Sequence, residues 1–430
     1  MMAASSSGAP RQRRSIIRDL LTVMSGTAGA QAIGLVILPV LARTFAPEAF
    51  GVFQLYLSLL IFSTVAVALR IELTLLSKPD AEAGHTLASL FNLVVVTSVV
   101  ITVALTLYGV VGRGVGFPVI FLGLGLIGNG FAQVASYKLI RDQNFSRLAG
   151  VKVSQVLVYA LVALVIAAFR PTVWGIITAD VAGRLVSGAI ALRVVGHRVT
   201  GAARGARFRE LAQFVRRHWE MAVFSLPGAL ANSGGAMLTP LMIFHVFGAA
   251  AAGQYGLVDR AMGVPVAMLV NAGSQVFAGR ITSHIRDGDR AAVLRILLRI
   301  VLPGAAVSAV GAAVAYAFIP SAFRLVFGVG WEQSIIIARI LIFSYAVTLV
   351  SGIVNQTLVS LSAYRLQSAW DMCWPIGIGS VWMVVVTQNY SLYTAVTLHA
   401  ATVAVLGLAF ILLCVINLYR ATIRHPEQGN

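Results

Sequence analysis

The segment LVILPVLARTFAPEAFGVFQL (Leu35–Leu55) resembles a later segment of the same chain, GAMLTPLMIFHVFGAAAAGQYGL (Gly235–Leu257). Two pairs of residues align, at spacings of 201 and 202 positions: Pro39 with Pro240, and Gly51 with Gly253. Each segment contains the end of one apolar stretch, a short break and the start of the next. The similarity predicts a fold built from two repeats of apolar helices.

The composition shows where such helices lie. Of the 430 residues, 58% are hydrophobic and only 11% are charged. Soluble globular proteins have about 45–50% apolar and about 25% charged residues, so this chain could not cover a water-facing surface. Disordered chains combine low hydrophobicity with high net charge, which excludes that class as well. The sequence therefore predicts an integral membrane protein.

Apolar stretches separated by charge, Gly and Pro predict an all-α protein with twelve membrane-spanning helices, since a spanning helix needs about 20 apolar residues. The predicted spans are 19–42, 50–76, 86–111, 119–137, 151–169, 173–193, 219–247, 254–278, 294–319, 332–358, 368–387 and 393–417. The loops between them are too short for a soluble catalytic domain.

Lys and Arg residues indicate the orientation, because they accumulate in cytoplasmic loops. The termini, alternate loops and adjoining span ends on one side carry 25 of the 32 basic residues, the other side carries four, and the remaining three arginines (Arg184, Arg260 and Arg339) fall further inside spans. We therefore expect both termini in the cytoplasm of a bacterial inner membrane. The same bias explains the net charge of +17 without nucleic acid as a partner.

A basic segment divides the chain into two halves of six spans. The predicted organisation is a cytoplasmic N-terminus (1–18), a six-helix lobe (19–193), a basic linker (194–218), a second six-helix lobe (219–417) and a cytoplasmic tail (418–430). Because each half has an even number of spans, the repeats are expected to be parallel. Such repeats are typical of transporters whose substrate path lies at the repeat interface.

No catalytic or metal-binding motif is convincing. The stretch GLGLIG (Gly123–Gly128) formally fits a dinucleotide fingerprint, but it lies inside an apolar span, where small residues serve helix packing. The seven histidines are scattered, with no acidic cluster beside them. We expect no enzyme activity, no metal and no cofactor.

Ionisable residues at membrane depth are the candidates for function, because they usually face a bundle interior or a wet cavity. They are Arg70 and Glu72 on the second span, Asp180 and Arg184 on the sixth, Asp259 and Arg260 on the eighth, and Arg339 on the tenth, with Gln275 further along the eighth.

Each candidate has a structural alternative. Asp180 and Arg184 are four residues apart and share a helix face, which favours an intrahelical pair over ion coupling. Arg70 and Glu72 either form an interfacial pair or line a cavity, and Arg339 either lines the cavity or extends to the surface.

Arg260 is the strongest candidate for a cargo contact, because it belongs to the helix pair that opens the second half of the chain and lies near Gln275. Its neighbour Asp259 points about 100° away on an ideal helix, so the two cannot address one ligand. Asp259 is instead grouped with Asp180 and Arg184 as a candidate for ion coupling. Arginines at mid-depth favour an anionic cargo, since guanidinium binds phosphate in bidentate fashion.

Four segments resemble the polysaccharide flippases of the multidrug/oligosaccharidyl-lipid/polysaccharide exporter superfamily. They are LPVLARTFAPEAFGVFQLYLSLL (Leu38–Leu60), the Arg-x-Glu of Arg70 and Glu72, AAAGQYGLVDRAMGVPVAML (Ala250–Leu269) and LVFGVGW (Leu325–Trp331). The resemblance extends in order over the whole chain, although its signatures are loose.

This resemblance implies two six-helix lobes around a central cavity that opens alternately to either side. The implied cargo is an undecaprenyl-pyrophosphate-linked oligosaccharide, moved from the cytoplasmic to the periplasmic leaflet. The implied cargo contacts are Arg70, Arg260 and Arg339. Implied partners are membrane lipids, H⁺ or Na⁺ as a coupling ion, and polysaccharide polymerase machinery.

Two features of the sequence argue against other branches of this superfamily, and a third argues against a membrane enzyme. Twelve spans argue against the lipid II branch, which typically has fourteen. The first span has no acidic residue beyond Asp19 at its edge, which argues against a cation-coupled drug or metabolite antiporter. A membrane polysaccharide polymerase or ligase is expected to have a large outer loop, and the outer loops here are short.

Overall fold

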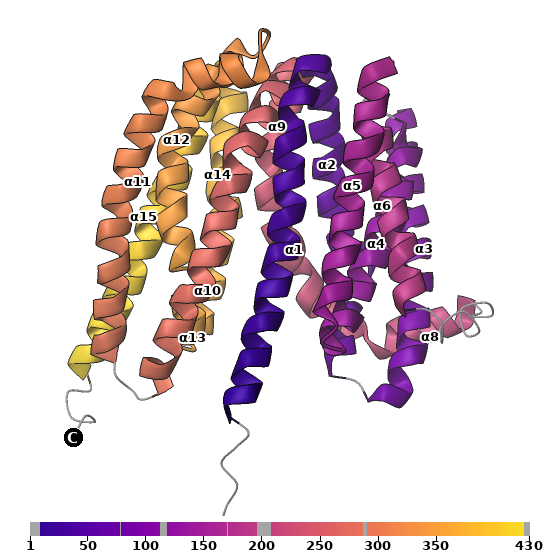
Figure 1. The fold of residues 1–430 in the computed structure, drawn as a ribbon, viewed down its shortest axis with the longest axis horizontal. Coiled ribbons are helices and arrows are strands. Elements are labelled where there is room, and N and C mark those ends of the chain that lie inside the picture. Colours follow the sequence, from indigo (N-terminus) through magenta and orange to yellow (C-terminus); the bar gives the residue numbers. More distant parts are fainter. Residues whose placement is uncertain are drawn as a thin grey trace, which may run out of the picture. The chain divides into compact units, whose positions relative to one another are not determined.

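The computed structural model describes residues 9–77, 79–111, 118–169, 171–195, 208–286 and 290–424, and every regular element in these ranges is helical. The first elements are α1 (Ala9–Thr44), α2 (Pro47–Val67), the 3₁₀ helix η1 (Ile71–Leu76), α3 (Asp80–Val111), α4 (Val119–Arg141), α5 (Phe145–Phe169), α6 (Val173–Val195) and α8 (Phe208–Arg217). They are followed by the π-helix η3 (Met221–Ser225), α9 (Leu226–Val258), the π-helix η4 (Asp259–Gly263), α10 (Val264–Arg286), α11 (Arg290–Phe327), α12 (Glu332–Ile353), α13 (Thr357–Ser360), α14 (Tyr364–Thr387) and α15 (Leu392–Arg424) (Figure 1).

The number of apolar helices agrees with the sequence. Ten helical stretches of the described residues are long and apolar enough to cross a membrane, and α1 adds a shorter apolar helix, Ala28–Thr44. One of the ten, Met221–Ile281, is interrupted at Gly248, whose φ of 86° and ψ of 178° are accessible to glycine. If this stretch is counted as two helices and α1 is included, the described residues contain twelve apolar helices, the predicted number.

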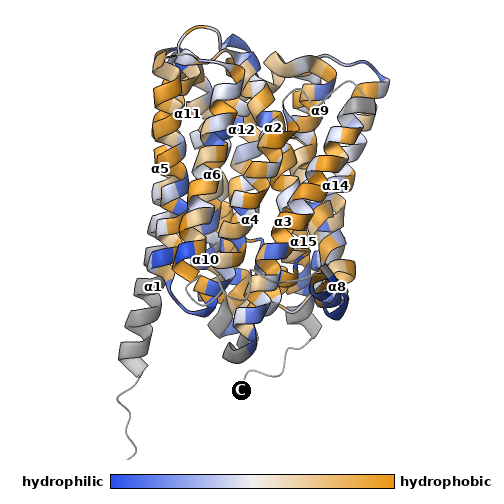
Figure 2. Cartoon of the chain, turned by 90° about the vertical axis from the view of Figure 1, so that its right-hand side faces the viewer, coloured by the Kyte–Doolittle hydropathy of each residue, from blue (hydrophilic) through white to orange (hydrophobic). Residues whose placement is uncertain are grey.

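The helices expose apolar side chains along their length, as expected of surfaces that face lipid. On α11, Leu302, Val307 and Val310 are 66%, 72% and 65% exposed. Figure 2 shows hydrophobic residues covering the long helices and hydrophilic residues gathering near helix ends and connections. Exposed apolar faces of this extent are unfavourable in water and favourable in a bilayer, where helices also satisfy their own backbone hydrogen bonds.

The chain forms two compact units that resemble the two expected lobes. Unit 1 contains residues 1–45 and 56–230, and unit 2 contains residues 46–55 and 231–430. Two differences from the expected boundaries stand out. The first half of α2 belongs to unit 2, and the division near residue 230 falls after the predicted linker 194–218, part of which lies outside the described residues.

Close helix packing at glycines builds unit 1. On α4, a Cβ at Gly128 would lie 2.6 Å from the backbone of Arg184 on α6. On α6, a Cβ at Gly188 would in turn lie 2.7 Å from the carbonyl oxygen of Gly128. Gly123 and Gly125 are likewise buried against neighbouring helices. The stretch GLGLIG is therefore a helix-packing surface, as predicted.

In unit 2, the first half of α2 crosses α9 at two glycines. A Cβ on Gly51 would lie 1.7 Å from the carbonyl oxygen of Ala249, and a Cβ on Gly253 would lie 1.8 Å from that of Pro47. Each glycine thus touches the residue four positions before the other. These are the two glycines that align between the repeats, so the crossing has the local two-fold symmetry expected of repeated helices.

The core of unit 2 is apolar. Side chains from α10, α11, α15 and the end of α12 form one buried cluster, which includes Phe277, Val293, Leu297, Val354 and Phe410. The predicted linker contributes one described helix to unit 1, α8, which packs against α3. On α8, Leu211 is buried while the basic residues near both ends are exposed, the pattern of a helix at a membrane surface.

Candidate functional site

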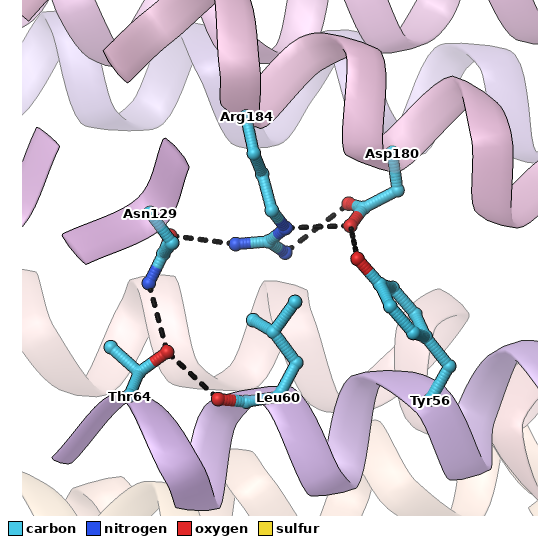
Figure 3. A network of polar contacts seen from close by, with 6 residues as sticks. All are labelled: Tyr56, Leu60, Thr64, Asn129, Asp180 and Arg184. Carbon is cyan, nitrogen blue, oxygen red and sulfur yellow. Dashed lines mark hydrogen bonds and ion pairs between the residues drawn. The ribbon is translucent and has the colours of Figure 1, made fainter. Parts of the chain in front are cut away.

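Asp180 and Arg184 form the intrahelical pair that their spacing predicts. Arg184 donates from Nε to Asp180 Oδ2 at 2.6 Å and from Nη2 to Asp180 Oδ1 at 3.2 Å. Its Nη1 donates to Asn129 Oδ1 on α4 at 2.7 Å (Figure 3). The side chains of the pair are only 11% and 10% exposed, so both charges are largely withdrawn from solvent.

The network around this pair extends to α2. Tyr56 donates its hydroxyl to Asp180 Oδ2 at 3.0 Å, and Asn129 Nδ2 donates to Thr64 Oγ1 at 3.1 Å. Thr64 then donates to the carbonyl oxygen of Leu60 (Figure 3). Three helices of unit 1 are therefore joined by polar contacts in which the opposite charges compensate each other. This arrangement favours a structural role, and coupling through Asp180 or Arg184 stays a prediction.

Arg70 and Glu72 do not form such a pair. Glu72 is fully buried, and its Oε1 accepts a hydrogen bond from Gln133 Nε2 of α4 at 3.0 Å. Among the described residues, Glu72 Oε2 and the buried Nε of Arg70 have no hydrogen-bond partner, and the two side chains make no ion pair. With no exposed surface, Glu72 does not face open space in this structure.

The backbone explains this arrangement. Leu69 and Arg70 have φ angles of 52° and 65°, both in the left-handed region. They end α2 and redirect the chain into η1, which packs against α4 and α3. The redirection buries Glu72 and leaves Arg70 partly exposed.

Arg260 contacts an amide and two aromatic rings within unit 2. Its Nη2 donates to Gln54 Oε1 at 3.2 Å, and its guanidinium lies 4.4 Å from the ring centre of Phe53 and 5.7 Å from that of Phe50. Cation–π contacts on two rings also fix the plane of the guanidinium, which suits recognition of an anion.

The segments that carry the family resemblance meet around this arginine. Phe50 contacts the buried Trp331 edge-on at 5.1 Å between ring centres. Gln254 donates to the carbonyl oxygen of Gly330 at 2.7 Å and accepts from the amide of Ser334 at 2.9 Å. Residues far apart in sequence are thereby held as one rigid group of unit 2.

The remaining candidates have separate surroundings. Asp259 accepts a long hydrogen bond of 3.5 Å from the hydroxyl of Tyr345 on α12. Arg339 donates to the carbonyl oxygen of Tyr316 at 3.2 Å and lies 4.7 Å from the centre of that ring. Gln275 is exposed on α10. Asp259 therefore contacts α12, and Arg339 of α12 contacts α11.

Several residues of these sites were not predicted. Gln54, Phe50 and Phe53 hold Arg260, and Gln133 and Asn129 hold Glu72 and Arg184. In the sequence they stand out only as polar or aromatic residues inside apolar spans. Many residues of this kind serve helix packing alone, so the pattern does not identify a site. No group of three or more His, Cys, Asp or Glu suited to a metal occurs in the part of the chain that the structure describes.

Comparison with known proteins adds a family and a fold. Residues 40–336 match the family of polysaccharide biosynthesis proteins. No curated protein matches the sequence. Among solved structures, the chain resembles an inward-facing multidrug resistance transporter of the MATE family and MOP superfamily, with a TM-score of 0.70, 10% identity and coverage of 92% of this chain and 96% of that one.

Two further structures share the fold. The inward closed conformation of the lipid II flippase MurJ has a TM-score of 0.68 and 9% identity, with 95% of this chain and 93% of that chain covered. A MOP superfamily transporter from Pyrococcus furiosus has a TM-score of 0.56 and 13% identity, with 98% and 100% covered. At these identities the likeness shows the fold, and substrates do not transfer with it.

Proposed function

The chain belongs to the family of polysaccharide biosynthesis proteins, and on this premise we propose that it is a membrane transporter that flips a lipid-linked oligosaccharide across the membrane. The MATE and MurJ folds that it resembles support this proposal. The proposed cargo is an oligosaccharide on undecaprenyl pyrophosphate. It moves from the cytoplasmic to the periplasmic leaflet as two lobes open alternately to either side. No covalent step is involved.

One observation carries the choice of an anionic lipid cargo. Arg260 is held by the Gln54 amide and by the rings of Phe50 and Phe53, and Phe50 in turn contacts Trp331. Three of the segments that carry the family resemblance therefore meet at this arginine. Guanidinium keeps its charge at any physiological pH and binds phosphate through two parallel hydrogen bonds. We assign Arg260 to the pyrophosphate, with Arg70 as a second contact and Arg339 and Gln275 as further ones.

The competing function is export of a drug or metabolite in exchange for an ion. A multidrug resistance transporter of the MATE family has the fold that this chain resembles. Cargo charge separates the two proposals. A pyrophosphate-linked cargo requires the arginines, whereas a cationic drug is repelled by them.

The test replaces Arg260 and Arg70 by Ala in cells that depend on this protein for surface polysaccharide. We expect each variant to reach the membrane in normal amount and to lose most export. Arg260→Lys should restore only part of it, because lysine keeps the charge but not the bidentate geometry. Arg324→Ala is the matched control, since this exposed arginine binds Glu332 at the end of α11.

Normal polysaccharide export by both the Arg260→Ala and the Arg70→Ala variants would show that neither arginine is needed to bind the cargo. Normal export in cells that lack the protein altogether would overturn the function itself.

The proposed orientation, with both termini in the cytoplasm, has its own test. In a variant without native cysteines, a membrane-impermeant thiol reagent added outside should label Val329→Cys and leave Gln143→Cys unlabelled. Val329 is 93% exposed between α11 and α12. Gln143 is exposed between α4 and α5, where the adjoining helix ends carry Lys138, Arg141 and Arg147. The reverse labelling pattern would invert the topology.

A further inference from the structure

Unit 2 contains a cavity that none of the candidate charges lines. Its volume is about 240 Å³, and its walls come from α9, α12, α14 and α15. It lies toward the end of the unit where α12 ends at Ile353 and α14 begins at Tyr364. In the proposed orientation this is the cytoplasmic side, where cargo is loaded.

One wall is aromatic. Trp370 and Trp374 lie one turn apart on α14 and therefore share a helix face. Trp370 also contacts Phe410 of α15, with 5.4 Å between ring centres, and this contact restricts the indole ring. Two indoles and a phenyl ring give the cavity rigid, flat surfaces.

The other walls are polar. Asn232 of α9, Ser351 of α12 and the exposed Asn355 after α12 supply amide and hydroxyl groups, and Asp371 supplies a carboxylate. Asp371 Oδ1 accepts a hydrogen bond from Gln367 at 2.8 Å. Pro375 also lines the cavity, and because it has no N–H, the carbonyl of Asp371 lacks its usual helical donor.

We propose that this cavity binds a sugar unit of the cargo. One face of a sugar ring carries C–H groups that pack against an indole ring, while its hydroxyls donate to and accept from amides, hydroxyls and carboxylates. A volume of about 240 Å³ is below the roughly 300–1,000 Å³ of pockets that enclose drug-sized ligands. The cavity therefore accommodates one sugar unit of an oligosaccharide, with the rest outside.

The lining disfavours the other parts of a lipid-linked cargo. Among the described residues that form the walls, none is Lys, Arg or His, so a pyrophosphate has no cation to bind here. An acyl chain in the cavity would offer no hydrogen-bond partner to the side chains of Asn232, Asn355 and Asp371, and burying these polar groups without partners costs free energy. The inference rests on the proposed function and extends it, because it assigns the sugar to a site that excludes the phosphate.

An organic cation is the one competing ligand of different chemistry. Two indoles beside a carboxylate form a site that attracts cations. Removal of the carboxylate separates the two ligands. Asp371→Asn keeps hydrogen bonding to a sugar but removes the charge that a cation requires.

The experiment measures binding to the purified full-length protein by calorimetry. The sugar probe is the oligosaccharide released by mild acid from the lipids that accumulate in cells lacking this protein, free of lipid and phosphate. The cation probe is tetraphenylphosphonium. We expect the wild type to bind the oligosaccharide, Trp374→Ala and Asn355→Ala each to weaken binding about tenfold, and Asp371→Asn to change it less than about threefold.

Two matched controls test for a general effect on the protein. Trp174→Phe changes an exposed indole in unit 1, and Gln356→Ala changes an exposed amide next to Asn355 that does not line the cavity. Both should bind the oligosaccharide as the wild type does. Trp374→Phe should recover part of the binding, which a merely unfolded Trp374→Ala variant would not explain.

The outcomes distinguish this inference from the proposed function. If the wild type supports polysaccharide export while Trp374→Ala and Asn355→Ala bind the oligosaccharide normally, the cavity assignment is wrong and the flippase stands. Binding of tetraphenylphosphonium that Asp371→Asn abolishes, without sugar binding, would replace the sugar by a cation. If cells lacking the protein keep their polysaccharide and accumulate no lipid-linked oligosaccharide, the function fails and this inference with it.

Discussion

Unit 1 contains two arginine–carboxylate combinations at membrane depth, and they behave in opposite ways. Asp180 and Arg184 bind each other through two hydrogen bonds and recruit Asn129 and Tyr56. Arg70 and Glu72 are closer in sequence, yet they make no ion pair, and each keeps a buried polar atom without a hydrogen-bond partner among the described residues.

Backbone geometry accounts for the difference. A four-residue spacing on the regular helix α6 stacks both side chains on one face. Across the left-handed turn at Leu69 and Arg70, a two-residue spacing does not bring Arg70 and Glu72 into an ion pair. The comparison teaches that an arginine and a carboxylate close together in a membrane span need not form an ion pair, so their presence alone does not tell a structural pair from charges available to a ligand. What matters is whether the backbone lets the opposite charges meet.

The largest expected effect comes from Asp180→Asn, which leaves Arg184 as a buried charge without its counter-ion. Removing one partner of a buried pair costs about 3–5 kcal/mol, so the purified variant should unfold at much lower temperature and accumulate poorly. Thermal unfolding in detergent measures this. Glu332→Gln, in the exposed pair with Arg324, is the control and should have no measurable effect. Wild-type stability of Asp180→Asn would show that the network is dispensable.

A smaller loss is expected for Asn129→Ala. This change removes the acceptor of Arg184 Nη1 and leaves a buried charged donor unsatisfied, at a cost of about 1.5–3 kcal/mol. The same unfolding measurement applies. Ser136→Ala on the same helix is the matched control, because the Ser136 hydroxyl bonds only to its own helix at Ala132. Equal stability of the two variants would contradict a role of Asn129 in holding the pair.

Arg70→Gly separates stability from transport. A residue other than glycine in the left-handed region costs about 1–2 kcal/mol, so glycine at this position should raise stability by about 1 kcal/mol while polysaccharide export is lost. Leu69→Gly relieves the same kind of strain and keeps the guanidinium, so its export should stay normal. If both variants lose export equally, the shape of the turn matters and the charge of Arg70 does not.

The smallest effect is expected for Glu72→Gln. The Glu72 side chain has one amide partner and no ion pair, so an amide of the same shape should change stability by less than about 1 kcal/mol. The same chemical change that disrupts Asp180 should therefore be tolerated here. A destabilisation as large as that of Asp180→Asn would reveal a charge partner for Glu72 and end the contrast between the two pairs.

The sequence predicted the features that depend on local pattern. Span number, the all-helical fold and the Asp180–Arg184 pair follow from hydrophobic length and helical spacing. The surroundings of Arg260 could not be predicted, because Gln54 and Phe53 come from a helix about 200 positions earlier in the chain and reach it only through tertiary packing. The burial of Glu72 depends on two left-handed residues, Leu69 and Arg70, and neither is a residue type that favours this conformation.

The α2–α9 crossing has a consequence for the origin of the chain. Gly51 of α2 meets Ala249 of α9, and Gly253 of α9 meets Pro47 of α2. Each helix therefore contributes the same two positions to the contact, a glycine and the residue four positions before it. That reciprocity is the rule of an isologous interface, in which one surface patch pairs with itself. A six-span protein carrying a single copy of this motif would satisfy the same contact as a homodimer. The crossing thus retains the form of a dimer interface inside one polypeptide, as expected if duplication and fusion of a half-length gene produced it.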